Sequence, residues 1–178
     1  LYKTSDAGQT WAKLTKGLPE GDTGRIGIDI YRRDPHVVYA IIENKNGGVF
    51  RSVDKGETWN KMSSTNPRPM YYSQIRIDPN NDLRIWVLGS PLYTSFDGGK
   101  TFRTDNIAPI HVDYHALPSP RTRTGARIHV DNHALWINPA NSNHMILGSD
   151  GGVKMSYDRG KTWGLIDNLP IGQFYEIG

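Results

Sequence analysis

Four short segments of the chain share one pattern, Ser/Thr-x-Asp-x-Gly-x-Thr-Trp/Phe, and this internal repetition constrains the fold more than any other feature. The segments read TSDAGQTW, SVDKGETW, SFDGGKTF and SYDRGKTW, and they recur within only 178 residues. A match over a whole motif that occurs four times in so short a chain is far beyond chance. The chain is therefore built from copies of one supersecondary unit, and we call each copy of the pattern a repeat motif.

The four repeat motifs have an aspartate, a glycine and an aromatic residue in common. These residues are Asp6, Gly8 and Trp11; Asp54, Gly56 and Trp59; Asp97, Gly99 and Phe102; and Asp158, Gly160 and Trp163. An aspartate in a tight turn accepts hydrogen bonds from backbone N–H groups, and glycine supplies a positive φ. The threonine and the aromatic residue then begin the next strand on alternate faces. We expect each repeat motif to be a hairpin and these residues to be structural.

The spacing of the repeat motifs predicts the size of the unit. Successive motif aspartates are 48, 43 and 61 residues apart. The last interval contains a near-duplicate, HVDYHAL from His111 and HVDNHAL from His129, and removing the 18-residue offset between the two copies restores an interval of 43. We interpret residues 109–128 as an inserted loop. A period in the forties matches one four-stranded blade of a β-propeller.

A second marker, Asp34-Pro35, Asp78-Pro79 or Asn138-Pro139, precedes each later motif aspartate by 19 or 20 residues. An X-Pro pair favours a turn, and apolar strands flank each pair. The sequence thus predicts an all-β protein made of four-stranded antiparallel propeller blades. The expected division is residues 1–19 for the outer strands of a first blade, 20–66 for a second blade, 67–108 for a third, 109–128 for the inserted loop, 129–170 for a fourth blade and 171–178 for the first strand of a next one.

Both terminal blades are incomplete in this division. An open stack exposes edge strands and apolar faces, so we expect the remaining blades, or a partner chain, to complete the propeller. The charge pattern gives no sign of a nucleic-acid partner, because the net charge is only +3 and the basic residues are scattered among carboxylates. No apolar run approaches the ~20 residues that span a bilayer. The absence of cysteine excludes disulfides and thiolate metal sites.

The repeat motifs resemble the Asp-box family, also called bacterial neuraminidase repeats, in which the box links the outer two strands of a blade. The segment ALWINPANSNHMILGSDGGVKMSYDRGKTW, the Asp-Pro turns and the segment NLPIGQFYEIG make the chain similar to bacterial secreted propellers of the sortilin and xyloglucanase types. The resemblance implies a secreted or periplasmic protein. It implies no single activity, because some such proteins hydrolyse glycans and others bind peptides or proteins.

The residues with most metal chemistry are His129, Asp131 and His133. Strand alternation would place their side chains on one face in steps of about 7 Å, and two imidazoles with a carboxylate can hold Zn²⁺ or another borderline metal. The near-duplicate supplies a second set, His111, Asp113 and His115. The alternative is that these side chains line the channel and hydrogen-bond to water and neighbouring strands. A divalent metal at these residues is the one cofactor that the sequence suggests.

A glycoside hydrolase needs two carboxyl groups about 5–5.5 Å or about 6.5–9.5 Å apart. Asp29, Asp78 and Asp131 lie on or beside inner strands and are the catalytic candidates, although Asp29 and Asp78 also fit as caps of turns or strands. A sialidase would carry a Phe-Arg-Ile-Pro-like motif, whereas the three Arg-Ile pairs here lack the flanking residues. Tyr71, Tyr72, Trp86 and Tyr93 are able to stack on sugars, but core or strand packing explains them better.

The sequence therefore predicts a propeller segment that acts as a binding scaffold for a glycan or a protein. The alternative is part of a xyloglucanase-like or sialidase-like glycoside hydrolase with acid and base carboxylates at the channel. A third hypothesis, an assembly factor that docks onto a membrane complex, requires a complementary charged face, which the scattered charges do not favour.

Overall fold

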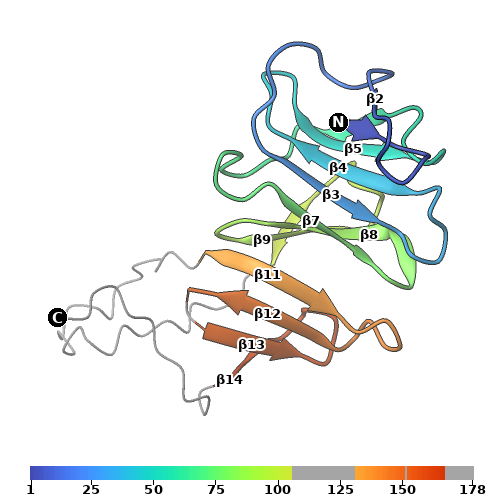
Figure 1. Ribbon diagram of the computed structural model, residues 1–178. Coiled ribbons are helices and arrows are strands. Elements are labelled where there is room, and N and C mark those ends of the chain that lie inside the picture. The colour runs from blue at the N-terminus through green and yellow to red at the C-terminus, as the bar shows by residue number, and fades with distance from the viewer. Residues whose placement is uncertain (106–130, 151, 167–178) are drawn as a thin grey trace, which may run out of the picture.

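The computed structural model describes residues 1–105, 131–150 and 152–166. These residues form β-strands and contain no helix, and therefore no helix that is long and apolar enough to cross a membrane. The strands belong to one two-stranded sheet and three four-stranded antiparallel sheets, stacked one on the next (Figure 1). The predicted all-β class and the four-stranded antiparallel unit are thus confirmed.

In every sheet, strands that are consecutive in the sequence are neighbours. The first sheet pairs β1 (Tyr2–Lys3) with β2 (Ala12–Lys13). The second contains β3 (Ile26–Ile30), β4 (Val38–Ile42), β5 (Gly48–Ser52) and β6 (Asn60–Ser63). The third contains β7 (Gln74–Asp78), β8 (Asn81–Leu88), β9 (Leu92–Ser95) and β10 (Arg103–Asp105). The fourth contains β11 (Asn132–Ile137), β12 (Met145–Ser149), β13 (Gly152–Ser156) and β14 (Gly164–Ile166). The predicted inserted loop and the predicted strand at residues 171–178 lie outside the described residues.

Strand β4 shows why the sheets stack face to face. All five of its residues are buried, which fits its unbroken run of apolar residues. Successive side chains of a strand point to opposite faces, so Tyr39 and Ile41 join one core cluster while Val38, Ala40 and Ile42 join another. A strand that is apolar on both faces needs a neighbouring sheet on each side.

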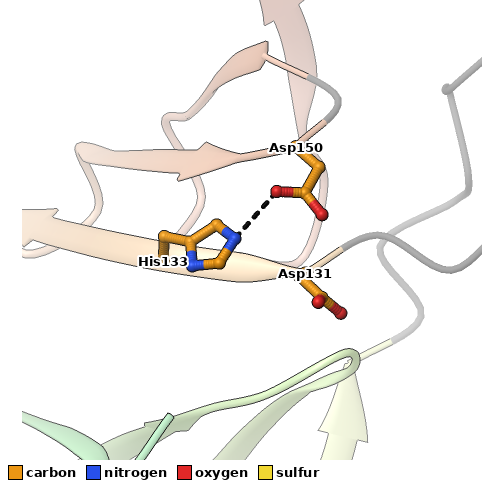
Figure 2. Close-up of side chains that lie close together, drawn as sticks. All are labelled: Asp131, His133 and Asp150. Atoms are coloured by element: carbon orange, nitrogen blue, oxygen red, sulfur yellow. Dashed lines mark hydrogen bonds and ion pairs between the residues drawn. The ribbon is translucent and has the colours of Figure 1, made fainter. Parts of the chain in front are cut away.

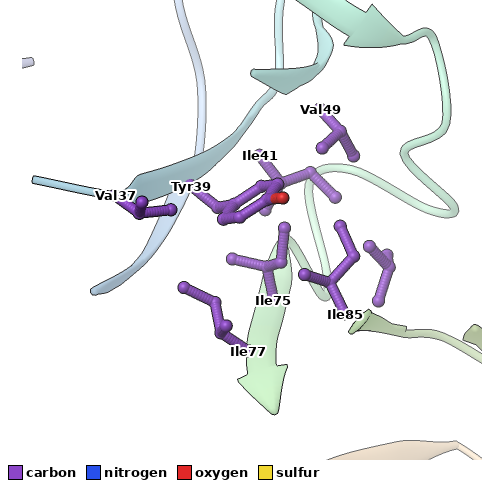
Figure 3. Packing of buried hydrophobic residues seen from close by; sticks show 8 residues of the cluster. Val37, Tyr39, Ile41, Val49, Ile75, Ile77 and Ile85 are labelled. Carbon is purple, nitrogen blue, oxygen red and sulfur yellow. The ribbon is translucent and has the colours of Figure 1, made fainter. Parts of the chain in front are cut away.

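Two of the core clusters lie between neighbouring four-stranded sheets. In the first, Tyr39, Ile41 and Val49 pack against Ile75 and Ile85 of the next sheet (Figure 3). In the second, a set of fully or nearly fully buried residues joins the third sheet to the fourth: Trp86, Leu88, Leu92, Leu135, Ile137, Met145 and Leu147. This is the packing of consecutive propeller blades, and we refer to the four-stranded sheets as blades.

Each repeat motif forms the hairpin between the third and fourth strand of its blade. Around Asp54, one carboxylate oxygen accepts hydrogen bonds from the Ser52 hydroxyl at 2.7 Å and the Thr58 N–H at 2.9 Å, and the other accepts from the Thr58 hydroxyl at 2.5 Å. Asp6, Asp97 and Asp158 make the same contacts in their motifs. The side-chain hydrogen bond from Thr58, with the backbone N–H bond, lowers the pKa of Asp54 to about 2.

The remaining motif residues complete the hairpin. The motif glycines Gly8, Gly56, Gly99 and Gly160 have φ between 81° and 90°, a conformation that other residues adopt at a cost. The indole N–H groups of Trp11 and Trp59 donate to the glycine carbonyls at 3.1 and 2.9 Å. Phe102 has no such donor, and the Trp163 Nε1 has no partner among the described residues.

The stack is open at both ends. Ile28 and Ile30 of β3 are each 49% exposed, and Trp136 of β11 is 47% exposed on the face of the last sheet opposite Leu135 and Ile137. In a complete propeller the neighbouring blades cover such faces. The described residues are therefore a part of a propeller, as the sequence predicts.

Candidate functional site

One end of the stacked blades gathers most of the polar side chains that have chemical interest. In an antiparallel blade the first and third strands begin, and the second and fourth strands end, at the same end. We call this end the loop end. It consists of the segment before β3, the β4–β5 turn, residues 64–73 before β7, the β8–β9 turn, Asp131 before β11 and the β12–β13 turn. Contacts between blades confirm the grouping, since Arg25 donates to the Tyr71 carbonyl and the Asn132 amide donates to the Gly89 and Ser90 carbonyls.

A polar cleft of about 720 Å³ opens at the loop end, and we call it the loop cleft. Its lining consists of Asp22, Thr23, Gly24, Ile42, Glu43, Asn44, Lys45, Gly47, Gly48, Ser64, Asn66 and Pro69. Most of the side chains in this lining carry a polar group, whereas the lining surface contains apolar and polar parts in similar amounts. Such a lining suits a ligand that has both hydroxyl groups and apolar faces.

Asn66 is the residue of the loop cleft whose hydrogen bonds are missing. Its amide nitrogen and its amide oxygen are both buried, and neither has a partner among the described residues. By contrast, Asn44 is fully engaged, because its amide donates to the Glu20 and Asp22 carbonyls and its oxygen accepts from the Asn46 N–H. Buried polar groups are nearly always paired, so the Asn66 amide requires a partner that the described residues do not supply.

The segment that carries Asn66 has an unusual backbone. Arg68 and Ser73 have φ of 46° and 41°, which is rare for residues other than glycine. The Arg68 carbonyl accepts from the Tyr71 and Tyr72 N–H groups, and the Ser73 hydroxyl donates to the Pro69 carbonyl at 2.5 Å. Such conformations persist only where the surrounding contacts hold them. Residues 64–73 are therefore held in one shape, with Tyr71 48% exposed at the surface.

Beside the loop cleft lies a group of ionic side chains that spans two blades. The buried carboxylate of Asp131 accepts from the Arg68 guanidinium at 3.2 and 3.4 Å and from the Ser90 hydroxyl at 3.1 Å. Nε2 of His133 lies 2.8 Å from a carboxylate oxygen of Asp150 (Figure 2). The side chains of His133 and Asp150 are 41% and 49% exposed, so this group is reachable from solvent.

Aromatic rings surround the ionic group. The rings of Tyr71 and Tyr72 lie 6.0 and 5.9 Å from the His133 ring, and the Arg68 guanidinium lies 4.8 Å from the Tyr71 ring centre. Burial, with the nearby Asp131 carboxylate, raises the pKa of the Tyr72 phenol, so this hydroxyl stays protonated. The rings restrict the orientation of the His133 imidazole.

The structure brings together Asp131 and His133 from the predicted metal residues, and it adds Asp150, which the sequence analysis missed. One ligand atom from each of the three lies within 4.8 Å of the others. Asp131 and His133 converge because the register shifts between Asn132 and Ala134, so the regular 7 Å spacing does not apply. In the antiparallel pairing of β11 with β12, Asn132 lies opposite Ser149, so the next residue, Asp150, lies opposite Asp131. Knowledge of this register would have identified Asp150 as a third ligand. His129, His111, Asp113 and His115 lie outside the described residues.

The catalytic candidates are separated in space. Asp29 lines a second cleft, of about 360 Å³, between the inner strands β3, β7 and β11, which we call the inner cleft. Burial raises the pKa of its carboxyl against the opposing hydrogen bonds from the Ile77 and Ile30 N–H groups. Asp78 is fully buried, pairs with Arg84 at 2.9 Å and accepts from the Ser142 hydroxyl, where no substrate reaches it.

The inner cleft contains one carboxylate among the described residues. Its other lining residues are Ile30, Tyr31, Arg32, Arg76, Ile77, Pro79, Leu135, Trp136, Ile137 and Pro139. Asp131 belongs to the loop end and does not line this cleft. The described lining of the inner cleft therefore does not contain the pair of carboxyl groups that glycoside hydrolysis requires.

The four aromatic residues that the sequence suggested for sugar stacking differ in their exposure to solvent. Tyr72 and Trp86 are 1% and 0% exposed and belong to the interior, whereas Tyr71 is exposed at the loop end. Tyr93 is half-buried and packs against the core of the second and third blades. Of these aromatic residues, Tyr71 has the exposed ring that stacking on a sugar requires.

Comparison with known proteins identifies the fold through solved structures. No protein-family model and no curated protein sequence matches the chain. An ancestral GH74 enzyme superposes with a TM-score of 0.61 and 15% identity, over 93% of this chain and 21% of that chain. The GH74 xyloglucanase from Xanthomonas campestris gives 0.61 and 16%, over 95% of this chain and 27% of that one.

YCF48 from Cyanidioschyzon merolae matches more weakly, with a TM-score of 0.48 and 20% identity over 84% of this chain and 39% of that chain. The chain thus spans only about a quarter of the length of the GH74 structures that it resembles. At such identities the similarity shows the fold alone, a β-propeller of which this chain supplies a part.

Proposed function

We propose that the chain is part of a binding scaffold whose loop end holds a glycan, in the loop cleft beside Asn66. The observation that carries this proposal is the buried, unpaired amide of Asn66. An amide offers two donors and two acceptor lone pairs, and a sugar hydroxyl both donates and accepts. When the Asn66 side chain turns toward the cleft, its amide can therefore pair with neighbouring hydroxyls of a sugar ring.

The rest of the loop cleft supports a glycan over a protein ligand. Protein interfaces depend on buried aromatic, arginine or aliphatic anchors at their centre, whereas the described lining of the loop cleft contains no aromatic residue and no arginine, and most of its side chains carry polar groups. Asp22 and Lys45 can bind hydroxyl groups, and the exposed ring of Tyr71, two residues from Pro69, can stack against a sugar face. A glycan-binding propeller also fits the secreted or periplasmic location that we propose for the protein.

The test is calorimetric titration of a panel of soluble plant, bacterial and animal oligosaccharides, with the natural protein and two variants. Asn66→Ala removes the unpaired amide, and Asn60→Ala removes an exposed amide on β6 as the matched control. We expect Asn66→Ala to weaken binding of the recognised glycan at least tenfold and Asn60→Ala to leave it unchanged. Unchanged binding to Asn66→Ala, or binding of peptides and of no glycan, contradicts the proposal.

A thermal melt separates this effect from misfolding. Removing a buried polar group that has no partner costs the fold nothing and relieves a desolvation penalty. Asn66→Ala therefore keeps or raises the melting temperature in the absence of ligand. A fall in the melting temperature would show instead that Asn66 has a structural partner.

A second candidate function, glycoside hydrolysis, rests on Asp29. Its raised pKa is the property of a general acid, and its position in the inner cleft is open to a ligand. The partner carboxylate would come from residues beyond the described ones. If the natural protein hydrolyses oligosaccharides and the Asp29→Asn variant does not, the result supports this function. If the natural protein hydrolyses no oligosaccharide, the result contradicts it.

A further inference from the structure

We propose that Asp131, His133 and Asp150 form a site for a divalent transition-metal ion of the zinc type. Asp131 and His133 lie at the start of β11, and Asp150 lies at the β12–β13 turn beside them (Figure 2). The proposal does not depend on glycan binding, because none of the three lines the loop cleft.

Backbone contacts set the positions of the two carboxylates. The Asp150 N–H donates to the Asp131 carbonyl at 3.1 Å, which fixes the β12–β13 turn against the start of β11. The Asn132 amide donates to the Gly89 and Ser90 carbonyls of the preceding blade. The ligand set is therefore anchored to two blades and is not a chance meeting of long surface side chains.

Groups around the three residues orient them as the surroundings of a metal site do. Metal-binding carboxylates are commonly held by further hydrogen bonds, and Asp131 accepts them from Ser90 and Arg68. The rings of Tyr71 and Tyr72 lie beside the His133 ring, and its Nε2 is directed at Asp150. Asp131 is buried and fixed, while the other two side chains are exposed and can adjust.

The chemistry of the ligand set selects the ion. An imidazole nitrogen with two carboxylates suits Zn²⁺, Fe²⁺, Co²⁺ or Ni²⁺ better than Ca²⁺ or Mg²⁺, which prefer oxygen ligands alone. A tetrahedral ion with bonds of about 2.0–2.1 Å holds its ligand atoms ~3.3 Å apart. Ligand atoms that already lie within 4.8 Å reach this spacing by rotation of the exposed His133 and Asp150 side chains.

The charge balance favours a cation. Two carboxylates meet at this point, and the Arg68 guanidinium contacts one of them, Asp131. The Arg68 contacts to Asp131 are long, at 3.2 and 3.4 Å, and half of the Arg68 side chain is exposed. The Arg68 guanidinium also lies over the Tyr71 ring, so it stays beside the site and supports the Asp131 carboxylate when an ion binds. Three protein ligands leave an open coordination position for water or a ligand group.

The experiment is titration of the metal-free natural protein with Zn²⁺ alone by calorimetry, and with Co²⁺ by visible absorption. Asp150→Asn and His133→Ala each remove one ligand. The matched control is His36→Ala, because His36 and Asp34 form an exposed pair at 2.7 Å that is like His133 and Asp150 but has no third ligand group in the described structure. Circular dichroism of each variant checks that it is folded.

We expect the unaltered protein to bind one ion per chain and to show the absorption band of four- or five-coordinate Co²⁺. Binding should be at least tenfold weaker in Asp150→Asn and in His133→Ala and unchanged in His36→Ala. Binding that persists in both ligand variants overturns the proposal, as does binding that disappears in His36→Ala. If the unaltered protein takes up neither ion, His133 and Asp150 are a simple ion pair, and the proposal is wrong.

Discussion

Replacing Trp59 with alanine tests the structural role of the repeat motif. Trp59 is 5% exposed, packs against Leu14 and Leu18, and donates its indole N–H to the Gly56 carbonyl. A tryptophan side chain buries about 200 Å², which corresponds to about 5 kcal/mol at about 25 cal/mol per Å². A compact denatured state lowers this value by ~10–40%, and the lost hydrogen bond adds about 1 kcal/mol.

We therefore expect Trp59→Ala to lower the free energy of unfolding by about 4–5.5 kcal/mol. The control is Val53→Ala in the same repeat motif. Val53 is 54% exposed, so its truncation changes the free energy of unfolding by less than about 0.5 kcal/mol. Urea denaturation followed by far-ultraviolet circular dichroism measures both. Similar losses for the two variants, or a loss below about 1.5 kcal/mol for Trp59→Ala, would refute the account of the motif as the link between hairpin and core.

Two further predictions concern ionisable groups. Because hydrogen bonds, the largest from the Thr58 side chain, lower the pKa of Asp54 from 3.8 to about 2, its contribution to stability is present above the unfolded pKa and is lost as the pH falls through about 2. Acid titration of unfolding should show a smaller loss over this range in Asp54→Asn, and an identical loss contradicts the assignment. Lys154 is 2% exposed, its ammonium group has no partner among the described residues, and burial lowers its pKa. Lys154→Met should raise the free energy of unfolding by about 1–3 kcal/mol, against no change in the exposed control Lys100→Met, and a destabilised Lys154→Met would reveal a partner.

The repeat pattern predicted the fold well because its signals are local. The turn chemistry of Asp54, Gly56 and Thr58 lies within one short segment, and the apolar run of β4 indicates a strand buried on both faces. Hydrophobic periodicity and turn residues therefore predict the blade without knowledge of its neighbours.

The candidate site was harder to predict because it depends on contacts between distant segments. Asp150 stands in a Ser-Asp-Gly-Gly turn, where an aspartate is ordinary, and only the pairing of β11 with β12 brings it to Asp131. Asn66 has no sequence signature at all, because a missing hydrogen-bond partner is visible only in three dimensions. The convergence of Asp131 and His133 depends on an irregular register that strand alternation does not predict.

Electron cryomicroscopy of the natural protein tests the central claim most directly, that these sheets are consecutive blades of a closed propeller completed by further blades. We expect a ring in which β3, β7 and β11 line a central channel and neighbouring blades cover Ile28 and Ile30 at one end of the stack and Trp136 at the other. An open stack in which these faces stay exposed to solvent, or a different fold packed against them, would contradict it.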